Sequence, residues 1–434
     1  MTDEYDADVL YPNATDGADD ADGADGADDG GDVSRRSLLA GSATAGALAM
    51  AGCLGDSEGD DGSGEETVYV FNTADKSVSV IDAATDELVT TQYLGATASF
   101  PANQYVSDYT TGPGDPVWLN VDQGVRAVDA ETLSELASLE TGSGANWQEV
   151  TPDGETLVVS AREPVHKLFK LDADPESDSF GEVLAEIDRS DEAGRGDKEG
   201  PGPCDVTIHP DGQYAYVPDI FADKLSVIDV ASFEIVEQVP VEPATDADAV
   251  APWMDTASPD GETLLVENNE GDHGTESIWD VSDPAAPEEV TRLTADDDLG
   301  ALPLTSEIGP DSKTGYVFTA NSKDVTVLDL EANEVVDRID LGGKAFVGTW
   351  DPNHEKLYVP VQTSDEVKVI DHAAGEVTAT IGVGSKPYGA TTGLVRPVGD
   401  TANNFLATAA SLGIELSESG TSYCIGECAC GHQW

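Results

Sequence analysis

Cysteine and histidine residues are concentrated at the carboxyl end of the chain, where they could bind a metal ion. Cys424, Cys428, Cys430 and His432 fall within nine positions. Soft thiolates combined with an imidazole suit zinc or copper. A local disulfide, which is favoured outside the cell, is the first alternative, and a reactive solvent-exposed tail is the second. The segment therefore predicts a metal-binding or redox-active tail, with these two alternatives open.

The elements that precede this tail are short strands in a repeating pattern. Seven times a bulky apolar residue runs into an aspartate at the end of an alternating apolar stretch, with separations of 42 to 57 residues. Repeats of 40 to 50 residues built from short strands are typical of a β-propeller. The pairs are Ile81-Asp82, Val128-Asp129, Leu171-Asp172, Ile228-Asp229, Trp279-Asp280, Leu328-Asp329 and Ile370-Asp371. We expect an all-β, seven-bladed β-propeller.

The repeat over residues 203–241 shows the expected order of strands within one blade. It predicts an inner strand at 205–209, a Pro-Asp-Gly turn at 210–212, and strands at 214–218, 224–229 and 234–239. The first repeat begins near Val68 without an inner strand, whereas residues 386–392 read as an inner strand without a blade. Pairing these two segments would close the ring and leave no open edge.

Four strands carry a motif that resembles the YVTN-type β-propeller repeat family. They are Tyr69-Val70-Phe71-Asn72, Tyr216-Val217-Pro218-Asp219, Tyr316-Val317-Phe318-Thr319 and Tyr358-Val359-Pro360-Val361. This wider group is similar to the propellers of cytochrome d1 nitrite reductase, nitrous oxide reductase and lactonases. The resemblance implies the fold and leaves the chemistry open.

Ligands of propellers usually bind on the face that carries the loops between second and third strands. A polar mouth that bears aromatic side chains would suit a small molecule or an ion. The alternative is that the tryptophans wedge between blades and the histidine caps a loop. The candidate residues for this face are Trp147, Asp219, Trp253, Asp255, Asn268, Asp272 and His273.

The composition is strongly acidic, with 86 acidic and 20 basic side chains and a formal charge of −66. Residues 1–66 contribute −16, so −50 belongs to the remaining 368 residues. The negative charges of such a domain repel one another in dilute buffer, and molar salt screens this repulsion. The composition resembles proteins of extremely halophilic archaea, and it excludes nucleic acid as a partner.

The amino-terminal segment is similar to an export and anchoring signal. Arg35-Arg36 followed by Leu38-Leu39 resembles the twin-arginine export signal, and the apolar stretch that follows is too short to span a bilayer. Met50-Ala51-Gly52-Cys53 resembles a lipobox, which implies lipidation of Cys53 and a membrane anchor on the extracytoplasmic face. An uncleaved signal anchor with a free cysteine is the alternative.

These features divide the chain into four parts. We expect a disordered acidic leader with the export signal at 1–52, a flexible acidic tether at 53–66, the propeller at 67–395 and an extension with the Cys/His tail at 396–434. The 424–428–432 spacing is similar to the binuclear copper motif of nitrous oxide reductase. We reject that activity because the chain lacks the cupredoxin domain, the second histidine and the following methionine.

Three functions are compatible with these features. The first is a lipid-anchored binding or assembly module without catalysis of its own, with a protein or small-molecule partner on the propeller face. The second is an extracytoplasmic metal-binding or redox protein that uses copper or zinc at the tail, or a cofactor on the propeller face. The third is a lactonase-like hydrolase. Nucleophile and nucleotide motifs such as Gly-x-Ser-x-Gly, His-Glu-x-x-His and the Walker loop are absent from the sequence.

Overall fold

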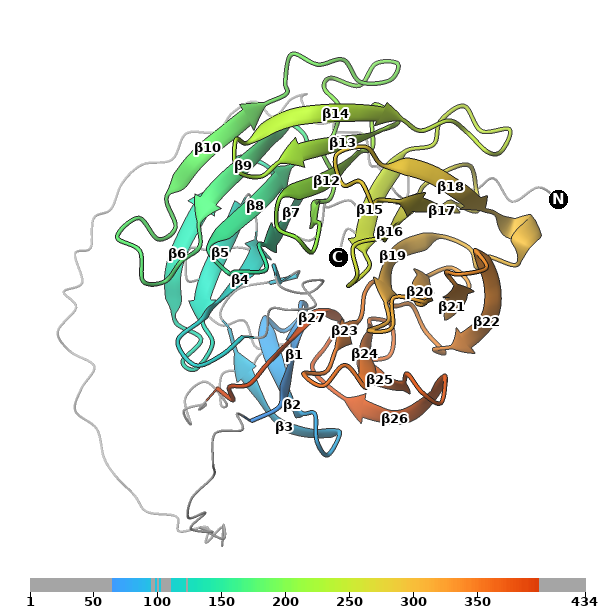
Figure 1. Cartoon of the computed structure of the whole chain (residues 1–434). Helices are drawn as coiled ribbons and strands as arrows, with labels where there is room; N and C mark the ends of the chain where they lie inside the picture. The colour runs from blue at the N-terminus through green and yellow to red at the C-terminus, as the bar shows by residue number, and fades with distance from the viewer. Residues whose placement is uncertain (1–64, 95–97, 100, 103–110, 122–123, 398–434) are drawn as a thin grey trace, which may run out of the picture. The chain divides into compact units, whose positions relative to one another are not determined.

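Seven antiparallel sheets follow one another around a ring in the computed structural model (Figure 1). The structure describes residues 65–397 except 95–97, 100, 103–110 and 122–123. Six sheets have four strands and one has three, and we call each sheet a blade. The seven-bladed propeller that the repeats predict is confirmed.

The strands of blades 1 to 3 run from the centre of the ring outward as follows. Blade 1 contains β27 (Pro387–Gly393), β1 (Thr67–Asn72), β2 (Ser77–Asp82) and β3 (Glu87–Tyr93). Blade 2 contains β4 (Pro116–Val121), β5 (Gly124–Asp129) and β6 (Glu135–Glu140). Blade 3 contains β7 (Asn146–Val150), β8 (Thr156–Ala161), β9 (Lys167–Asp172) and β10 (Val183–Asp188).

Blades 4 to 7 repeat the same order. Blade 4 contains β11 (Thr207–Ile208), β12 (Tyr214–Asp219), β13 (Lys224–Asp229) and β14 (Glu234–Pro240). Blade 5 contains β15 (Pro252–Ala257), β16 (Thr263–Asn268), β17 (Thr275–Asp280) and β18 (Glu288–Leu293). Blade 6 contains β19 (Pro303–Ile308), β20 (Thr314–Thr319), β21 (Asp324–Asp329) and β22 (Glu334–Asp340). Blade 7 contains β23 (Thr349–Trp350), β24 (Lys356–Val361), β25 (Glu366–Asp371) and β26 (Glu376–Gly382).

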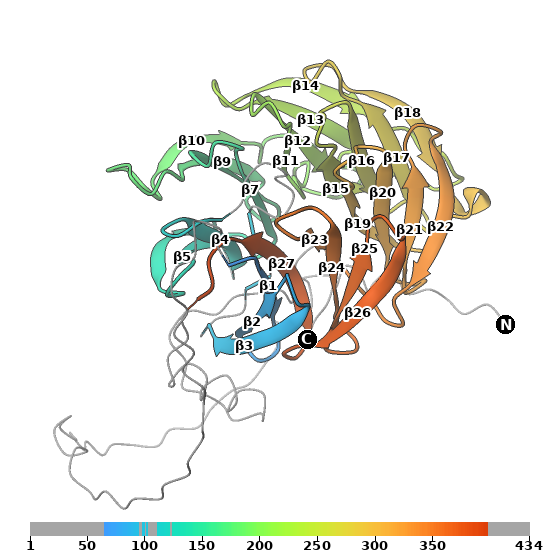
Figure 2. The same ribbon diagram turned by 60° about the horizontal axis from the view of Figure 1, so that its bottom comes forward.

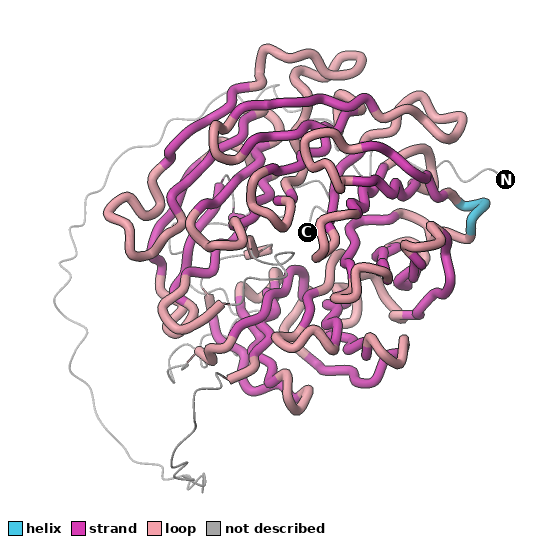
Figure 3. Tube along the Cα trace, viewed as in Figure 1, coloured by secondary structure: helices cyan, strands magenta, loops and turns pink. Residues whose placement is uncertain are grey.

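A short 3₁₀ helix, η2 (Ala295–Asp297), links blades 5 and 6 and is drawn in cyan in Figure 3. Beside blade 2, Ala102 donates its backbone N–H to Trp118 (2.8 Å), so the chain at this point runs along the inner side of β4. The predicted inner strand at 205–209 is shorter than expected, since β11 covers Thr207–Ile208 alone. The rest of that blade agrees with the prediction to within a residue at each end.

The repeated aspartate has a structural cause, because in every blade it ends the strand before the outermost one (β5 in blade 2, the third strand elsewhere) and forms the following turn. Asp82 Oδ1 accepts the backbone N–H groups of Ala84 (3.0 Å) and Thr85 (3.1 Å). Asp371 Oδ1 accepts that of Ala374 (2.7 Å), and the turn ends at Gly375 with a φ of 67°. A short acidic side chain satisfies turn amides that the strand leaves free, which explains why the sequence repeats this residue.

The ring closes between the first and the last described strands, as predicted. β1 pairs with β27 in antiparallel register, with Val70 opposite Ala390. Figure 2 shows β27 lying beside β1 in blade 1. Arg396 Nη2 forms an ion pair with Asp82 Oδ2 (3.0 Å), which adds a side-chain contact to the backbone closure. Closure gives β1 a partner on both sides and removes an open sheet edge.

The hydrophobic core lies mainly between neighbouring blades. Leu264, Val266 and Trp279 of blade 5 pack with side chains of blade 4, whereas Leu265 and Ile278 of the same blade pack with blade 6. Successive strand residues therefore face opposite neighbours, as the pleat of a strand requires. This alternation decides which junction each inner polar side chain enters.

Candidate functional site

The two tryptophans predicted for the channel mouth lie in one apolar cluster at the inner strands. Trp147 of β7 and Trp253 of β15 are both buried in this cluster, together with Phe346 and Tyr388. The Phe346 and Tyr388 rings stack with their centroids 5.1 Å apart. These aromatic rings therefore fill space between blades in the described structure.

Asp219, at the end of β12, is held by an arginine. Arg189 donates to both carboxylate oxygens, at 2.6 and 2.8 Å, and neither side chain is exposed to solvent. Ser226 donates its hydroxyl to Asp219 Oδ2 (2.7 Å), and Glu192 binds the other side of the guanidinium (2.8 Å). This network ties the segment that follows β10 to blade 4.

The predicted loop after β16 divides between buried and exposed positions. Asn268 is buried and donates to Ser277 Oγ (2.8 Å), whereas Asp272 is exposed. His273 Nε2 contacts the carbonyl oxygen of Leu299 (2.8 Å). Beneath the loop, Glu270 accepts from Arg292 Nη1 (2.7 Å). The loop is thus anchored by its own blade, and its two predicted polar tips lie apart from the buried tryptophans.

Asp255 of β15 faces the junction with blade 4 and differs sharply from its neighbour Asp205. Asp205 accepts two backbone N–H groups, from Val206 (2.7 Å) and from Asp255 (2.9 Å). The carboxyl group of Asp255 has no backbone N–H donor among the described residues, and the Thr207 hydroxyl lowers its pKa less than burial raises it. Two carboxyl groups in unlike surroundings lie at one junction, and Asp205 is the better stabilised as an anion.

Sequence reasoning missed four further carboxyl groups at the inner and middle strands. All of them are buried, and they occupy blades 3, 5 and 6: Glu149 of β7, Glu267 of β16, Glu276 of β17 and Glu307 of β19. Glu149 accepts the backbone N–H of Ile208 (3.0 Å), which joins blade 3 to blade 4. The signal that could have found the others is an acid inside an apolar strand, as in Leu-Leu-Val-Glu at 264–267.

Burial raises the pKa of each of these carboxyl groups, since it removes the solvent that stabilises the charged form. The pKa of Asp255 lies well above its usual range, first because of burial and then because of the charge of Asp205. Burial raises the pKa of Glu267 to about 7. At these positions burial therefore favours the neutral carboxylic acid over the carboxylate.

Cys204, the remaining cysteine of the propeller, is covered in the same region. Its Sγ lies 3.8 Å from Nη1 of Arg162, and burial raises the pKa of the thiol to about 12. Burial likewise lowers the pKa of His166, which favours the neutral imidazole. A thiol in this setting is not a nucleophile, because the thiolate is the reactive form.

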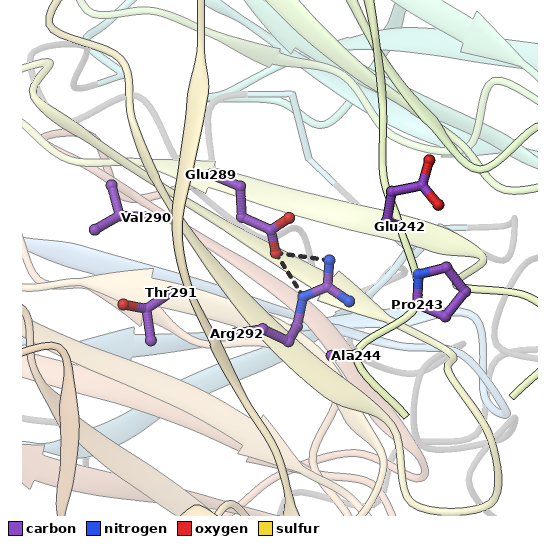
Figure 4. A pocket seen from close by; sticks show the side chains of 7 residues that line it. All are labelled: Glu242, Pro243, Ala244, Glu289, Val290, Thr291 and Arg292. Carbon is purple, nitrogen blue, oxygen red and sulfur yellow. Dashed lines mark hydrogen bonds and ion pairs between the residues drawn. The ribbon is translucent and has the colours of Figure 1, made fainter. Parts of the chain in front are cut away.

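One surface pocket lies away from the centre, at the outer strand of blade 5 (Figure 4). It has a volume of about 210 Å³ and is formed by two segments, Glu242–Ala244 and Glu289–Arg292. Arg292 and Glu289, two of the lining residues, form an ion pair with each other (2.6 Å), drawn as dashed lines in Figure 4. Because its arginine is already neutralised, the pocket has little to offer an anion.

Several predicted sites lie outside the described residues, namely Arg35, Arg36, Cys53 and the tail of Cys424, Cys428, Cys430 and His432. Within the described ranges, no three His, Cys, Asp or Glu side chains converge so that they could hold a metal ion. The described part of the chain also contains no helix that is long and apolar enough to cross a membrane.

The sheet order and the closure by β27 define a seven-bladed β-propeller, and solved structures share this architecture. No protein-family model matches the chain, and no curated protein matches it. The periplasmic gluconolactonase of Pseudomonas aeruginosa is 16% identical with a TM-score of 0.57, over 76% of this chain and 99% of its own.

Two further solved structures are similar over comparable lengths. A putative 6-phosphogluconolactonase from Bacteroides uniformis is 17% identical with a TM-score of 0.56, over 76% of this chain and 99% of its own. Hydrazine synthase of Kuenenia stuttgartiensis is 17% identical with a TM-score of 0.54, over 74% and 99%. At such identities the likeness shows the fold alone.

Proposed function

We propose that the propeller is a binding or assembly module that has no catalysis of its own. The observation that carries this proposal is the use of inner polar groups as bonds between blades. Thr207 Oγ1 donates to the carbonyl of Asp255 (2.7 Å), and Thr256 Oγ1 donates to that of Ser306 (2.9 Å). Polar groups that hold adjacent blades in register make a rigid platform, which suits presentation of loops to a partner.

The expected address of this platform supports the same proposal. The lipobox at Cys53 and the acidic segment 54–66 would place the propeller on the extracytoplasmic face of the membrane at the end of a tether. A partner in that setting is a protein or a small molecule, and the negative charge of the chain disfavours polyanions. The anchor itself is tested by fractionation, since Cys53→Ser should release the protein from membranes.

Cross-linking on intact cells tests the platform directly. Because the surface is rich in carboxylates, a carboxylate-reactive cross-linker is the suitable probe. We expect cross-links from loops of one face of the ring to the same partner in repeated preparations. Cross-links that scatter over both faces and the outer strands, with no recurring partner, would contradict the proposal. Asp272→Asn removes one exposed loop carboxylate and leaves the hydrogen bonds between blades intact, so it tests whether a cross-link comes from this loop.

A second candidate is hydrolysis of a small lactone, and the Asp205–Asp255 junction favours it. Two carboxyl groups whose surroundings separate their proton affinities can divide the roles of base and acid. In this role Asp205 would accept a proton from the attacking water and Asp255 would donate one to the leaving oxygen. Both side chains are buried and burial raises the pKa of Asp205 as well, so the reaction requires this junction to open to water and substrate. The gluconolactonase with the same fold adds a chemical precedent for such a substrate class.

An assay of glucono-δ-lactone hydrolysis by the purified protein distinguishes the lactonase candidate from the binding module. The candidate requires turnover above the uncatalysed rate that falls at least about a hundredfold in Asp255→Asn. Turnover equal to the uncatalysed rate, or unchanged by Asp255→Asn, would remove it. Circular dichroism of the variant shows whether the ring has remained folded.

The third candidate is metal or redox chemistry at the tail, favoured by the spacing of Cys424, Cys428, Cys430 and His432. Elemental analysis of protein purified without chelator tests it. Near-stoichiometric copper or zinc that is lost in Cys428→Ser would support this candidate. Metal-free protein that shows a disulfide in the tail by mass spectrometry would exclude it.

A further inference from the structure

Blade 5 carries an acid pair at a position that is free of charged side chains in every other blade. Glu267 of β16 lies directly opposite Glu276 of β17. The equivalent cross-strand pairs are entirely apolar in blades 1, 4, 6 and 7: Phe71–Val78, Pro218–Leu225, Phe318–Val325 and Pro360–Val367. In blades 2 and 3 they are Asn120–Val125 and Ser160–Leu168. The repeat therefore shows what this position holds when it serves packing alone.

Neither glutamate of this pair is satisfied as an anion. Both side chains are 0% exposed; the Ser306 hydroxyl beside Glu267 lowers the pKa of that acid less than burial raises it, and Glu276 has no hydrogen-bond donor among the described residues. Like charges directly opposite each other on one sheet face repel. The nearest cation, Arg292 of β18, is already bound to Glu270 and Glu289. An ionised pair in this place would lack both solvent and counter-charge.

Two further acids extend this arrangement into the neighbouring junctions. Among the described residues, Asp255 has no backbone donor to either side-chain oxygen, and Glu307 of β19 has no donor to Oε1. We call Asp255, Glu267, Glu276 and Glu307 the buried acid set. The titratable and charged groups that act on this set from neighbouring elements are Glu149, Asp205, Tyr216 and Arg292.

A carboxyl group deprived of water, cation and hydrogen-bond donors takes up a proton rather than remain charged. We propose that the buried acid set is a proton-held lock, in which neutral carboxylic acids keep blades 4, 5 and 6 packed and loss of their protons at alkaline pH releases them. The chemistry needs no ligand other than the proton. Glu267 and Glu276 stand in the place of apolar side chains while they are protonated, and each acid of the set opposes packing once it is ionised.

The direction of the effect follows from linkage. Carboxyl groups of the unfolded chain titrate at a pKa of about 4, whereas burial raises the pKa in the folded ring, for Glu267 to about 7. The folded state therefore binds more protons than the unfolded state in this window. The stability that these protonated acids contribute is fully present below about pH 4, and for Glu267 it is lost as the pH rises through about 7. For each proton that the folded state binds in excess of the unfolded state, the folding equilibrium constant falls about tenfold per unit rise in pH.

Equilibrium unfolding of the full chain at constant molar salt tests the lock. We expect the wild-type folding constant to fall from about pH 5 to about pH 9. In Glu267→Gln/Glu276→Gln the fall should be smaller by up to about tenfold per pH unit for each acid removed. The replacement E267F/E276V, which copies the pair of blade 6, should abolish the same part of the dependence and raise stability at high pH.

The matched control is Thr256→Val. Thr256 is also buried in blade 5 and donates to the carbonyl of Ser306 (2.9 Å), but it does not titrate, so its replacement should lower stability without changing the pH slope. A wild-type stability that is independent of pH, or a slope that all three variants share, would overturn the proposal.

Infrared spectroscopy gives a readout that does not depend on folding of a variant. The folded wild type at neutral pH should show the carbonyl stretch of protonated carboxylic acids, and titration to alkaline pH should remove it. Isotopic labelling of glutamate separates the glutamate part of the band from the aspartate part, Glu267→Gln/Glu276→Gln shows how much of it belongs to the pair, and Asp255→Asn resolves the aspartate contribution. Absence of this band from the folded wild type would by itself refute the lock.

Discussion

Arg189 and Asp219 form a bidentate ion pair inside the propeller, with Nη1 2.6 Å from Oδ1 and Nη2 2.8 Å from Oδ2. The arginine belongs to the segment after blade 3, and the aspartate ends the second strand of blade 4. Glu192 and Ser226 complete the hydrogen bonding of the pair. A fully buried charge pair survives only with such complete satisfaction, so each member depends on the other.

Removing one member should therefore be costly. Asp219→Ala leaves the Arg189 guanidinium without its buried counter-charge, and we expect a loss of about 3–5 kcal/mol in the free energy of unfolding. Denaturant titration in molar salt measures it. The control is Glu186→Ala, which breaks a surface ion pair with Lys167 and should cost about 1 kcal/mol or less. Equal losses in the two variants would contradict this account.

The closing strand makes a second prediction. A chain that stops after Ser385 lacks β27, so β1 loses its inner partner and blade 1 its innermost strand. We expect this truncation to show no cooperative unfolding transition. A chain that stops after Pro397 retains β27 and the Arg396–Asp82 ion pair, and it should unfold cooperatively. An unchanged melting temperature in the chain that stops after Ser385 would show that the propeller does not need the pairing of β27 with β1.

The architecture could be predicted from the sequence because its cause is local. Each Asp at the end of a third strand binds turn amides two or three residues further on, and this bond depends on nothing outside the turn. The closure was also predictable, since β27 is an inner strand without a blade and β1 starts a blade without an inner strand. Local turn chemistry and a count of strands were sufficient for both.

The third prediction concerns salt. The −50 carried by the 368 residues after Glu66 repels itself over about 10 Å at 0.1 M salt and over about 3 Å at 1 M. We expect the far-UV circular dichroism of the folded protein to be lost on dialysis from molar to millimolar salt. Recovery of the signal on return to molar salt would separate loss of screening from aggregation. A spectrum that survives dialysis would contradict the prediction.

The fourth prediction concerns the thiol of the propeller. Burial raises the pKa of Cys204 to about 12, so the reactive thiolate is absent from the folded protein at pH 8. A variant in which serine replaces the other four cysteines should react with a thiol reagent only after unfolding. Fast labelling of the folded form would show that the inner strands of blades 3 and 4 open to solvent.

The candidate site was less accessible to sequence reasoning than the fold. The sequence predicts Asp255 at an open mouth, but the pleat of β15 directs it into the junction with blade 4, where it lacks backbone donors. Glu267 and Glu276 escaped notice because acids are so abundant in this chain that two more carry no signal by themselves. Their unusual position is recognised only by comparing equivalent cross-strand pairs, because blade 6 has Phe318 opposite Val325 where blade 5 has the two glutamates.

The seal between β1 and β27 also sets the order in which the molecule can be completed. Thr67 and Thr392 are hydrogen-bonded although 325 residues separate them in the chain. The ribosome must therefore synthesise almost the whole propeller before β27 can pair with β1, and contacts this distant in sequence form late. Until then β1 has an unpaired edge, so we expect the nascent chain to be most prone to mispairing at blade 1.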